Sequence, residues 1–134
     1  MVEREFPASD EVLGDVTAFV EEELGKVGCP PALITKISII LEEIFVNISH
    51  YAYHGEEGKM KLCVDAAESS VKMIFSDRGV PFNPLEKKDP DITLSAEERG
   101  IGGLGIFMMK KAMDKVSYNY VDGCNVLTVE KKFC

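Results

Sequence analysis

The chain has 134 residues, of which 46% are hydrophobic and 28% are charged. This length corresponds to about one domain with its own hydrophobic core, and the composition excludes both a disordered chain and a membrane-embedded one. The formal net charge of −8 argues against nucleic acid as a partner, because the phosphate backbone is held by clustered Lys and Arg. It does not argue against a single nucleotide, which backbone amides, a helix N-terminus and Mg²⁺ can hold with little positive charge.

The N-terminal part of the chain predicts a short strand followed by a helix. Residues 4–6 read as an extended segment that Pro7 ends. Ser9 is a suitable N-terminal cap for a helix whose apolar residues recur at helical spacing, namely Val12, Val16, Phe19, Val20 and Leu24. Gly25 and Gly28 are expected to end this helix.

A second helix is expected to begin at Pro30-Pro31 and to run to about Tyr53. Proline is tolerated there because the N–H groups of a first helical turn lack intrahelical partners. The helix is apolar on more than one face, which predicts central packing. Its apolar run from Ile37 to Val46 is too short and too polar to span a bilayer. Since no basic and apolar leader follows Met1 either, we expect a cytoplasmic protein with reduced cysteines.

The rest of the chain predicts strands with one helix among them. Two strands are expected over 60–66 and 71–76, and apolar residues alternate with polar ones in the second of them. A helix over about 104–113 precedes two closing strands over 116–121 and 126–132, which flank a turn at 122–125. This order of elements predicts an α+β two-layer sandwich.

One long segment, residues 83–103, has little periodicity and much turn chemistry. Loops beyond about 12–15 residues are uncommon in compact domains and are usually functional or disordered. The segment also separates two clusters of candidate site residues. We therefore interpret it as a lid over a ligand.

The first cluster is Glu43 and Asn47 in the second helix. Residues four apart project from the same helix face, so a carboxylate and an amide lie about one turn apart. An amide oxygen is a suitable ligand for Mg²⁺, and the carboxylate can accept a proton from a hydroxyl that attacks a phosphate. The neighbouring Glu42 points elsewhere. Without the rest of the chain, a satisfied polar pair in the core would explain Glu43 and Asn47 as well.

The second cluster follows a strand. Asp77 lies where that strand ends, and Gly79 permits a tight turn. A carboxylate fixed there can accept a hydrogen bond from an exocyclic amine, which distinguishes adenine from guanine. An Asp-x-Gly pattern alone is weak, because Asp and Gly are common in turns.

The third cluster is the glycine-rich segment 100–106. Gly100-x-Gly102-x-x-Gly105 matches the dinucleotide-binding fingerprint literally, but that fingerprint must follow a buried strand and the preceding residues are polar and irregular. Too little chain remains after Asp122 for a parallel, doubly wound sheet. We interpret the cluster as the end of the lid, whose amides meet a triphosphate at a helix N-terminus.

The three clusters together resemble the ATP-binding motifs of the GHKL ATPases. Glu43-x-x-x-Asn47 resembles the N-box, Asp77-x-Gly79-x-x-Phe82 the G1 box, and 102–106 the G2 box. Residues 46–53 and 102–114 look like the anti-sigma-factor serine/threonine kinase branch, and the similarity spans essentially the whole chain. The resemblance implies one domain over 1–134 with the Bergerat fold, a mixed, mostly antiparallel sheet covered by helices on one face.

By this resemblance, Asn47 binds Mg²⁺, Glu43 is the general base and Asp77 reads adenine. The other residues expected to shape the ATP pocket are Gly79, Phe82, Gly102, Gly103, Leu104 and Gly105, and Thr128 in the last strand is expected to support the adenine side. The resemblance further implies phosphorylation of a serine on an anti-sigma factor antagonist of the STAS type. It also implies capture of a sigma factor and a homodimer.

Two departures from the family pattern leave alternatives open. Tyr51 stands where the family often has a His, and the glycine cluster lacks the common Gly-Arg-Gly form. Neither departure affects Glu43 or Asn47. One alternative is an ATP-dependent module that switches partners without phosphotransfer, and the other is an α+β domain that binds no nucleotide.

Overall fold

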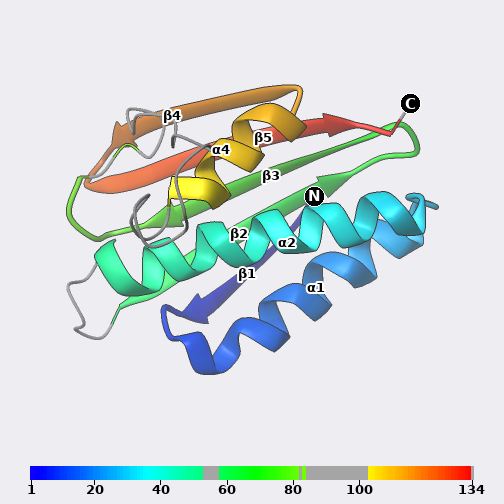
Figure 1. Ribbon diagram of the computed structural model, residues 1–134. Helices are drawn as coiled ribbons and strands as arrows, with labels where there is room; N and C mark the ends of the chain where they lie inside the picture. Colours follow the sequence, from blue (N-terminus) through cyan, green and yellow to red (C-terminus); the bar gives the residue numbers. More distant parts are fainter. Residues whose placement is uncertain (53–57, 82, 84–102, 134) are drawn as a thin grey trace.

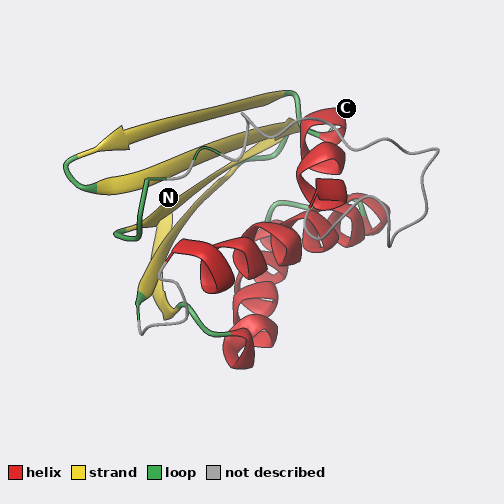
Figure 2. Ribbon diagram, turned by 60° about the vertical axis from the view of Figure 1, so that its left-hand side comes forward, coloured by secondary structure: helices red, strands yellow, loops and turns green. Residues whose placement is uncertain are grey.

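The computed structural model describes residues 1–52, 58–81, 83 and 103–133. Its helices cover one face of a five-stranded sheet, as Figures 1 and 2 show from two directions. The expected α+β two-layer sandwich is therefore confirmed. Among the described residues, no helix is long and apolar enough to cross a membrane.

The N-terminal elements form as expected, with small shifts in their bounds. Strand β1 covers Val2–Pro7. A short 3₁₀ helix, η1 (Asp10–Val12), leads directly into α1 (Leu13–Lys26), and the Ser9 side chain accepts a hydrogen bond from the Glu11 N–H. The buried residues of α1 recur at helical spacing and form its apolar stripe, namely Val16, Phe19, Val20 and Leu24.

Helix α2 (Pro31–Asn47) is the central helix, and it packs against both α1 and α4. It ends at Asn47, earlier than the sequence predicted, and the chain continues as a π-helical turn, η2 (Ile48–Ala52). Tyr53, where the helix was expected to end, lies outside the described residues. The change of winding follows directly after Asn47, so this candidate site residue is the last residue of α2.

The remaining strands complete one antiparallel sheet. Strands β2 (Lys59–Ala66) and β3 (Ser70–Asp77) follow β1, and β4 (Lys115–Val121) and β5 (Cys124–Lys132) close the chain. The strand order is β1-β2-β3-β5-β4, and every pairing among these strands is antiparallel. The sheet is thus wholly antiparallel within the described residues, without the parallel pair that a mixed sheet would contain.

The hairpin between β4 and β5 is tighter than the predicted turn over 122–125. Asp122 and Gly123 alone form the turn, with φ of 52° and 78°. Two consecutive residues with positive φ give the type I′ geometry that matches the twist of a two-residue hairpin. As a result, Cys124 and Asn125 belong to β5, and the prediction that they lie in a turn is wrong.

The hydrophobic core lies between the sheet and the helices. Alternate residues of the strands face the helices, and among the fully buried side chains are Phe45 of α2, Leu62 of β2, Phe75 of β3 and Met109 of α4. Helix α4 (Gly103–Ala112) packs on α2 over the same face of the sheet. The opposite face carries cross-strand ion pairs, such as Lys61 with Glu3 at 3.1 Å. One face of the sheet is therefore dry and the other polar.

Two glycines should respond oppositely to substitution by alanine. Gly123 has a φ of 78°, whereas Gly14 lies in the first turn of α1 without positive φ, and a Cβ would meet nothing within 4 Å at either position. We expect Gly123→Ala to lower the free energy of unfolding by about 1 kcal/mol because of backbone strain, and Gly14→Ala to raise it by up to ~1 kcal/mol. Urea denaturation of both variants measures the difference, and equal effects of the two would contradict the turn geometry.

Candidate nucleotide site

The predicted site residues gather at one end of the two-layer sandwich. The C-terminal end of α2, the C-terminal end of β3, the beginning of β5 and the beginning of α4 lie toward the same side, on the left in Figure 1. Because β3 and β5 are antiparallel neighbours, the last residue of β3, Asp77, is paired with Asn125 near the start of β5. Topology therefore brings together positions 48 residues apart in the chain.

On the helical side, Glu43 and Asn47 occupy the last turns of α2. Glu43 is half-buried and Asn47 is 8% exposed, whereas Glu42 is exposed. The helical spacing places the Glu43 carboxylate and the Asn47 amide on one face, as predicted. Glu42 lies on the solvent side, which agrees with its exclusion from the site.

The Asn47 amide has an unsatisfied donor. Its Nδ2 atom is buried and finds no hydrogen-bond partner among the described residues. A buried polar atom without a partner costs on the order of 1–3 kcal/mol, and such groups in native proteins usually have a functional reason. The alternative of a satisfied polar pair in the core therefore does not describe Asn47. The donor fits a site that receives an oxygen-rich ligand.

On the sheet side, Asp77 is a buried carboxylate, 7% exposed, at the end of β3. Its Oδ1 accepts two hydrogen bonds, from the Gly79 N–H and from Asn125 Nδ2, both at 2.9 Å. Burial raises the pKa of Asp77, and these two hydrogen bonds oppose that rise. Since both bonds end on Oδ1, Oδ2 remains an acceptor for a donor supplied by a ligand.

Asn125 is a site residue that the sequence-based prediction missed. It is buried, its Nδ2 also donates to the Val80 carbonyl at 2.8 Å, and its Oδ1 accepts a hydrogen bond from the Tyr118 hydroxyl. The side chain thereby ties Asp77 to the turn that follows β3. The Asp122-Gly123 dipeptide was the signal that could have found it, because a two-residue turn puts Asn125 into the strand.

Thr128 does not join this network. It lies three residues beyond Asn125 in β5, and side chains alternate between the two faces of a strand. Asn125, Leu127 and Val129 face the helices, so Thr128 faces the opposite side of the sheet. The structure thus separates Thr128 from Asp77, and the residue of β5 that bonds to Asp77 is Asn125 instead of the expected Thr128.

The glycine cluster is described only in part. Gly103, Leu104 and Gly105 form the first turn of α4, one residue earlier than the predicted helix start, while Gly102 and Phe82 lie outside the described residues. Most of the predicted lid at 83–103 lies outside them as well. The N–H groups of a first helical turn have no intrahelical acceptors and attract anions. The beginning of α4 is thus suited to phosphate oxygens.

These observations define the class of the protein as an α+β domain with a polar site between its helical layer and one end of an antiparallel sheet. Residues 6–131 match the family model of the histidine kinase-like ATPase domain. The chain belongs to this family. The family model therefore confirms the resemblance to GHKL ATPases and their anti-sigma kinase branch at the level of the family.

Several relatives are similar over much of the chain. The serine-protein kinase RsbW of Bacillus pumilus is 25% identical over 133 residues, which cover 94% of this chain and 82% of that protein. RsbW of Listeria monocytogenes is 30% identical over 99 residues, covering 70% of this chain and 63% of that protein. The serine/threonine-protein kinase BtrW of Bordetella bronchiseptica is 26% identical over 94 residues, covering 69% of this chain and 66% of that protein.

Solved structures support the fold. The catalytic domain of the histidine kinase ThkA superposes with a TM-score of 0.54 at 18% identity, covering 99% of this chain and 98% of that one. A chain of the SiaB–SiaC complex from Pseudomonas aeruginosa gives a TM-score of 0.58 at 12% identity, covering 98% of this chain and 89% of that one. These matches bear out the histidine kinase-like ATPase fold.

The raised pKa of Asp77 predicts that this carboxylate weakens the fold at neutral pH. A carboxyl group with a raised folded-state pKa binds its proton more tightly in the folded than in the unfolded chain. Stability therefore falls as pH rises from the ordinary value of 3.8 through the raised value, and the penalty is largest above the raised value. We expect Asp77→Asn, whose Oδ1 can accept the same two hydrogen bonds, to raise the melting temperature at pH 7. The gain should disappear toward pH 3.

The matched control is Asp65→Asn, because Asp65 is exposed in β2 on the polar face of the sheet. Its effect on the free energy of unfolding should stay within about 0.5 kcal/mol. Calorimetric melting curves from pH 3 to pH 8 measure both variants. A lower melting temperature for Asp77→Asn at pH 7 would show that Asp77 supports the fold rather than a ligand.

Proposed function

We propose that this chain binds Mg·ATP and transfers its γ-phosphate to a serine of a small antagonist protein. The observation that carries the proposal is the presence of two buried polar groups at the same end of the fold. These are the Asn47 amide with its unpartnered donor and the Asp77 carboxylate with its open oxygen. Membership of the histidine kinase-like ATPase family and similarity to proteins named serine-protein kinases support it.

Asp77 provides the adenine side of the proposed site. The free Oδ2 of an ionised carboxylate accepts a hydrogen bond from the exocyclic amine of adenine, whereas guanine presents a carbonyl oxygen at that position, which the carboxylate repels. Asn125 and the Gly79 N–H hold the other oxygen, so the orientation of the acceptor is fixed before a ligand enters.

Asn47 and the beginning of α4 provide the phosphate side. The Asn47 amide oxygen would hold Mg²⁺, and the ion would supply positive charge that offsets the negative charge of the phosphates. The unpartnered Nδ2 of Asn47 would donate to a phosphate oxygen or to a bound water. The amides of Gly102, Gly103, Leu104 and Gly105 would contribute further donors at the N-terminal end of the helix.

Glu43 is the proposed general base. It is half-buried and precedes Asn47 by one helical turn on the same face, so its carboxylate is held beside the phosphate side of the site. A serine hydroxyl that attacks the γ-phosphate must lose its proton, and a positioned carboxylate accepts it. Glu42 is exposed and takes no part in this step.

The proposed partners follow from the kinase branch that the chain resembles. They are an anti-sigma factor antagonist of the STAS type as the phosphate acceptor, a sigma factor as the captured protein, and a second copy of the chain in a homodimer. The names of the RsbW and BtrW relatives support the kinase part of this proposal. The cytoplasmic location stays a prediction.

Nucleotide binding tests the site directly. Titration calorimetry of the wild-type chain should show tighter binding of ATP than of GTP, and Mg²⁺ should strengthen the binding of ATP. Asn47→Ala removes the metal ligand, so we expect it to weaken Mg·ATP binding by at least about tenfold, or ~1.4 kcal/mol. Binding of ATP in EDTA should weaken less, because only the hydrogen bond from Nδ2 is lost there.

A matched control for this variant is Asn119→Ala, since Asn119 is exposed in β4 on the polar face of the sheet. It should bind Mg·ATP as the wild type does. If neither ATP nor GTP binds to the wild type with or without Mg²⁺, the assignment of the site is wrong, and the alternative of an α+β domain without a nucleotide holds.

Phosphotransfer is tested by a pair of adjacent glutamates. Glu43→Gln should reduce phosphate transfer from γ-labelled ATP to an STAS-type antagonist of the same organism by about 10²–10⁴-fold, the usual contribution of a general base. ATP affinity should be retained, and Glu42→Gln should leave both properties unchanged. Transfer at the wild-type rate by Glu43→Gln would exclude Glu43 as the base. If ATP regulates partner binding by the wild-type chain but no phosphate is transferred, the chain is a partner-switching module.

A further inference from the structure

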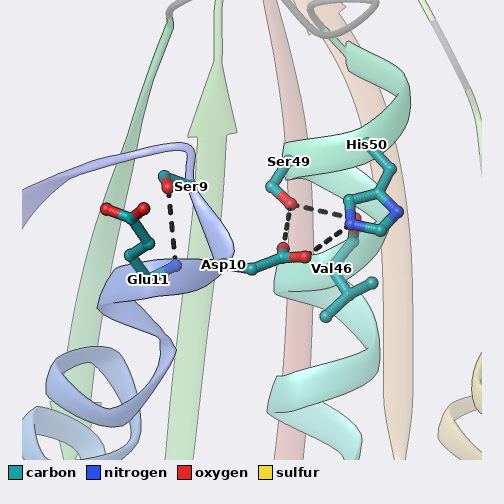
Figure 3. A network of polar contacts seen from close by, with 6 residues as sticks. All are labelled: Ser9, Asp10, Glu11, Val46, Ser49 and His50. Carbon is teal, nitrogen blue, oxygen red and sulfur yellow. Dashed lines mark hydrogen bonds and ion pairs between the residues drawn. The ribbon is translucent and has the colours of Figure 1, made fainter.

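Beside the proposed metal ligand, one carboxylate ties together two segments that are far apart in the sequence. Asp10 lies in η1, and its Oδ1 accepts a hydrogen bond from Ser49 Oγ at 2.5 Å while its Oδ2 lies 2.6 Å from His50 Nε2 (Figure 3). Ser49 and His50 belong to η2, which follows α2 directly. We call these three residues the Asp10 clamp.

The clamp acts on the segment that sets the orientation of Asn47. Asn47 is the last residue of α2, and the winding changes to a π-helical turn immediately after it. Helix ends fray when no tertiary contact holds them. Here the two residues that follow Ile48 are both bonded to one carboxylate of a different element. The turn that directly follows Asn47 is therefore tied to η1.

The two bonds of the clamp differ in their surroundings. His50 and Asp10 side chains are 51% and 53% exposed, so this contact by itself resembles a surface ion pair, which is worth little. Ser49, in contrast, is buried at 9% exposure, and its hydroxyl also lies 3.4 Å from the Val46 carbonyl. A buried hydroxyl that links the end of α2 to η1 constrains the backbone around Asn47 more than a solvated ion pair would.

The charge state of Asp10 is consistent with this role. Hydrogen bonds from Ser49 and His50 lower the pKa of Asp10, so the carboxylate is ionised at neutral pH and accepts from both partners at once. An amide in its place has only one acceptor oxygen. It could keep the bond from Ser49 as it stands, whereas the contact with His50 would require the amide N–H to donate to a neutral Nε2.

We propose that the Asp10 clamp is a positioning element that fixes Asn47 and thereby sets the affinity of the site for Mg²⁺ together with a nucleotide. The inference rests on the proposed function for its metal. Asp10, Ser49 and His50 do not touch the ligand in this proposal. Their effect reaches the site through the end of α2.

The test separates the metal-dependent part of binding from the rest. For each variant, the affinity for ATP in Mg²⁺ is divided by the affinity in EDTA, both measured by titration calorimetry. Ser49→Ala and Asp10→Asn should lower this ratio by about tenfold, the lower end of the ~10–100-fold loss that follows removal of a residue supporting a metal ligand. The affinity in EDTA should stay within about twofold of the wild type.

Three further variants serve as controls. Asp15→Asn removes an exposed acid from the first turn of α1 without touching the clamp, and should leave the ratio unchanged. His50→Gln keeps a side-chain donor for Asp10. Its ratio of ATP affinity in Mg²⁺ to that in EDTA should therefore lie closer to the wild-type ratio than that of His50→Ala. Melting curves confirm that each variant is folded, and His50→Gln is the mildest change should Ser49→Ala unfold the chain.

A readout without nucleotide distinguishes failure of this inference from failure of the proposed function. In the ligand-free protein, the side-chain amide signals of Asn47 in a ¹⁵N correlation spectrum should shift in Ser49→Ala and Asp10→Asn and stay in place in Asp15→Asn. If the wild type binds no nucleotide, the proposed function fails, and these signals alone decide whether the clamp positions Asn47. Unchanged Asn47 signals, or an unchanged Mg²⁺ ratio in a chain that binds ATP, would overturn the clamp.

Discussion

The antiparallel pairing of β3 with β5 is the constraint on which the rest of the structure depends. It joins residues that are far apart in the chain in the middle of the sheet, from Ser70 with Lys132 to Asp77 with Asn125. Closing so long a loop has an entropic cost, which only extensive pairing and core burial offset. The chain between the two strands includes α4, which lies on the helical face against α2. One pairing therefore sets the sheet order, places α4, and creates the polar end of the site.

The buried polar residues show where the fold departs from an ordinary core. Five described polar residues are buried, namely Ser38, Asn47, Ser49, Asp77 and Asn125. Ser38 is bonded to Glu21 between α1 and α2, while the other four belong to the candidate site or to the Asp10 clamp. A protein that needed only a stable core would replace most of these by apolar groups at little cost. Their concentration at one end is a physical argument for a ligand, independent of any family resemblance.

The two sides of the site are built differently. On the sheet side, Asp77, Asn125, Tyr118 and the Gly79 N–H form a connected network on paired strands, so the carboxylate is fixed before any ligand arrives. On the helical side, Asn47 stands at a helix end with an unpartnered donor, and the Asp10 clamp is the described contact that restrains the following turn. The proposed base recognition thus rests on the sheet, whereas the proposed metal and phosphate contacts depend on helix ends.

Most helices and strands, the α+β class, the helical pairing of Glu43 with Asn47 and the place of Asp77 at a strand end could be predicted from the sequence alone. These features follow from short-range periodicity, which a single segment carries without reference to the rest of the chain. Only the tertiary structure decided that Asn125 rather than Thr128 supports Asp77, and that Asp10 reaches Ser49 and His50. The face on which a strand residue lies changes with every single step along the strand. A turn of two residues instead of four was therefore enough to move Asn125 from the predicted turn into β5. The clamp joins residues about forty positions apart, and no local pattern encodes such a contact.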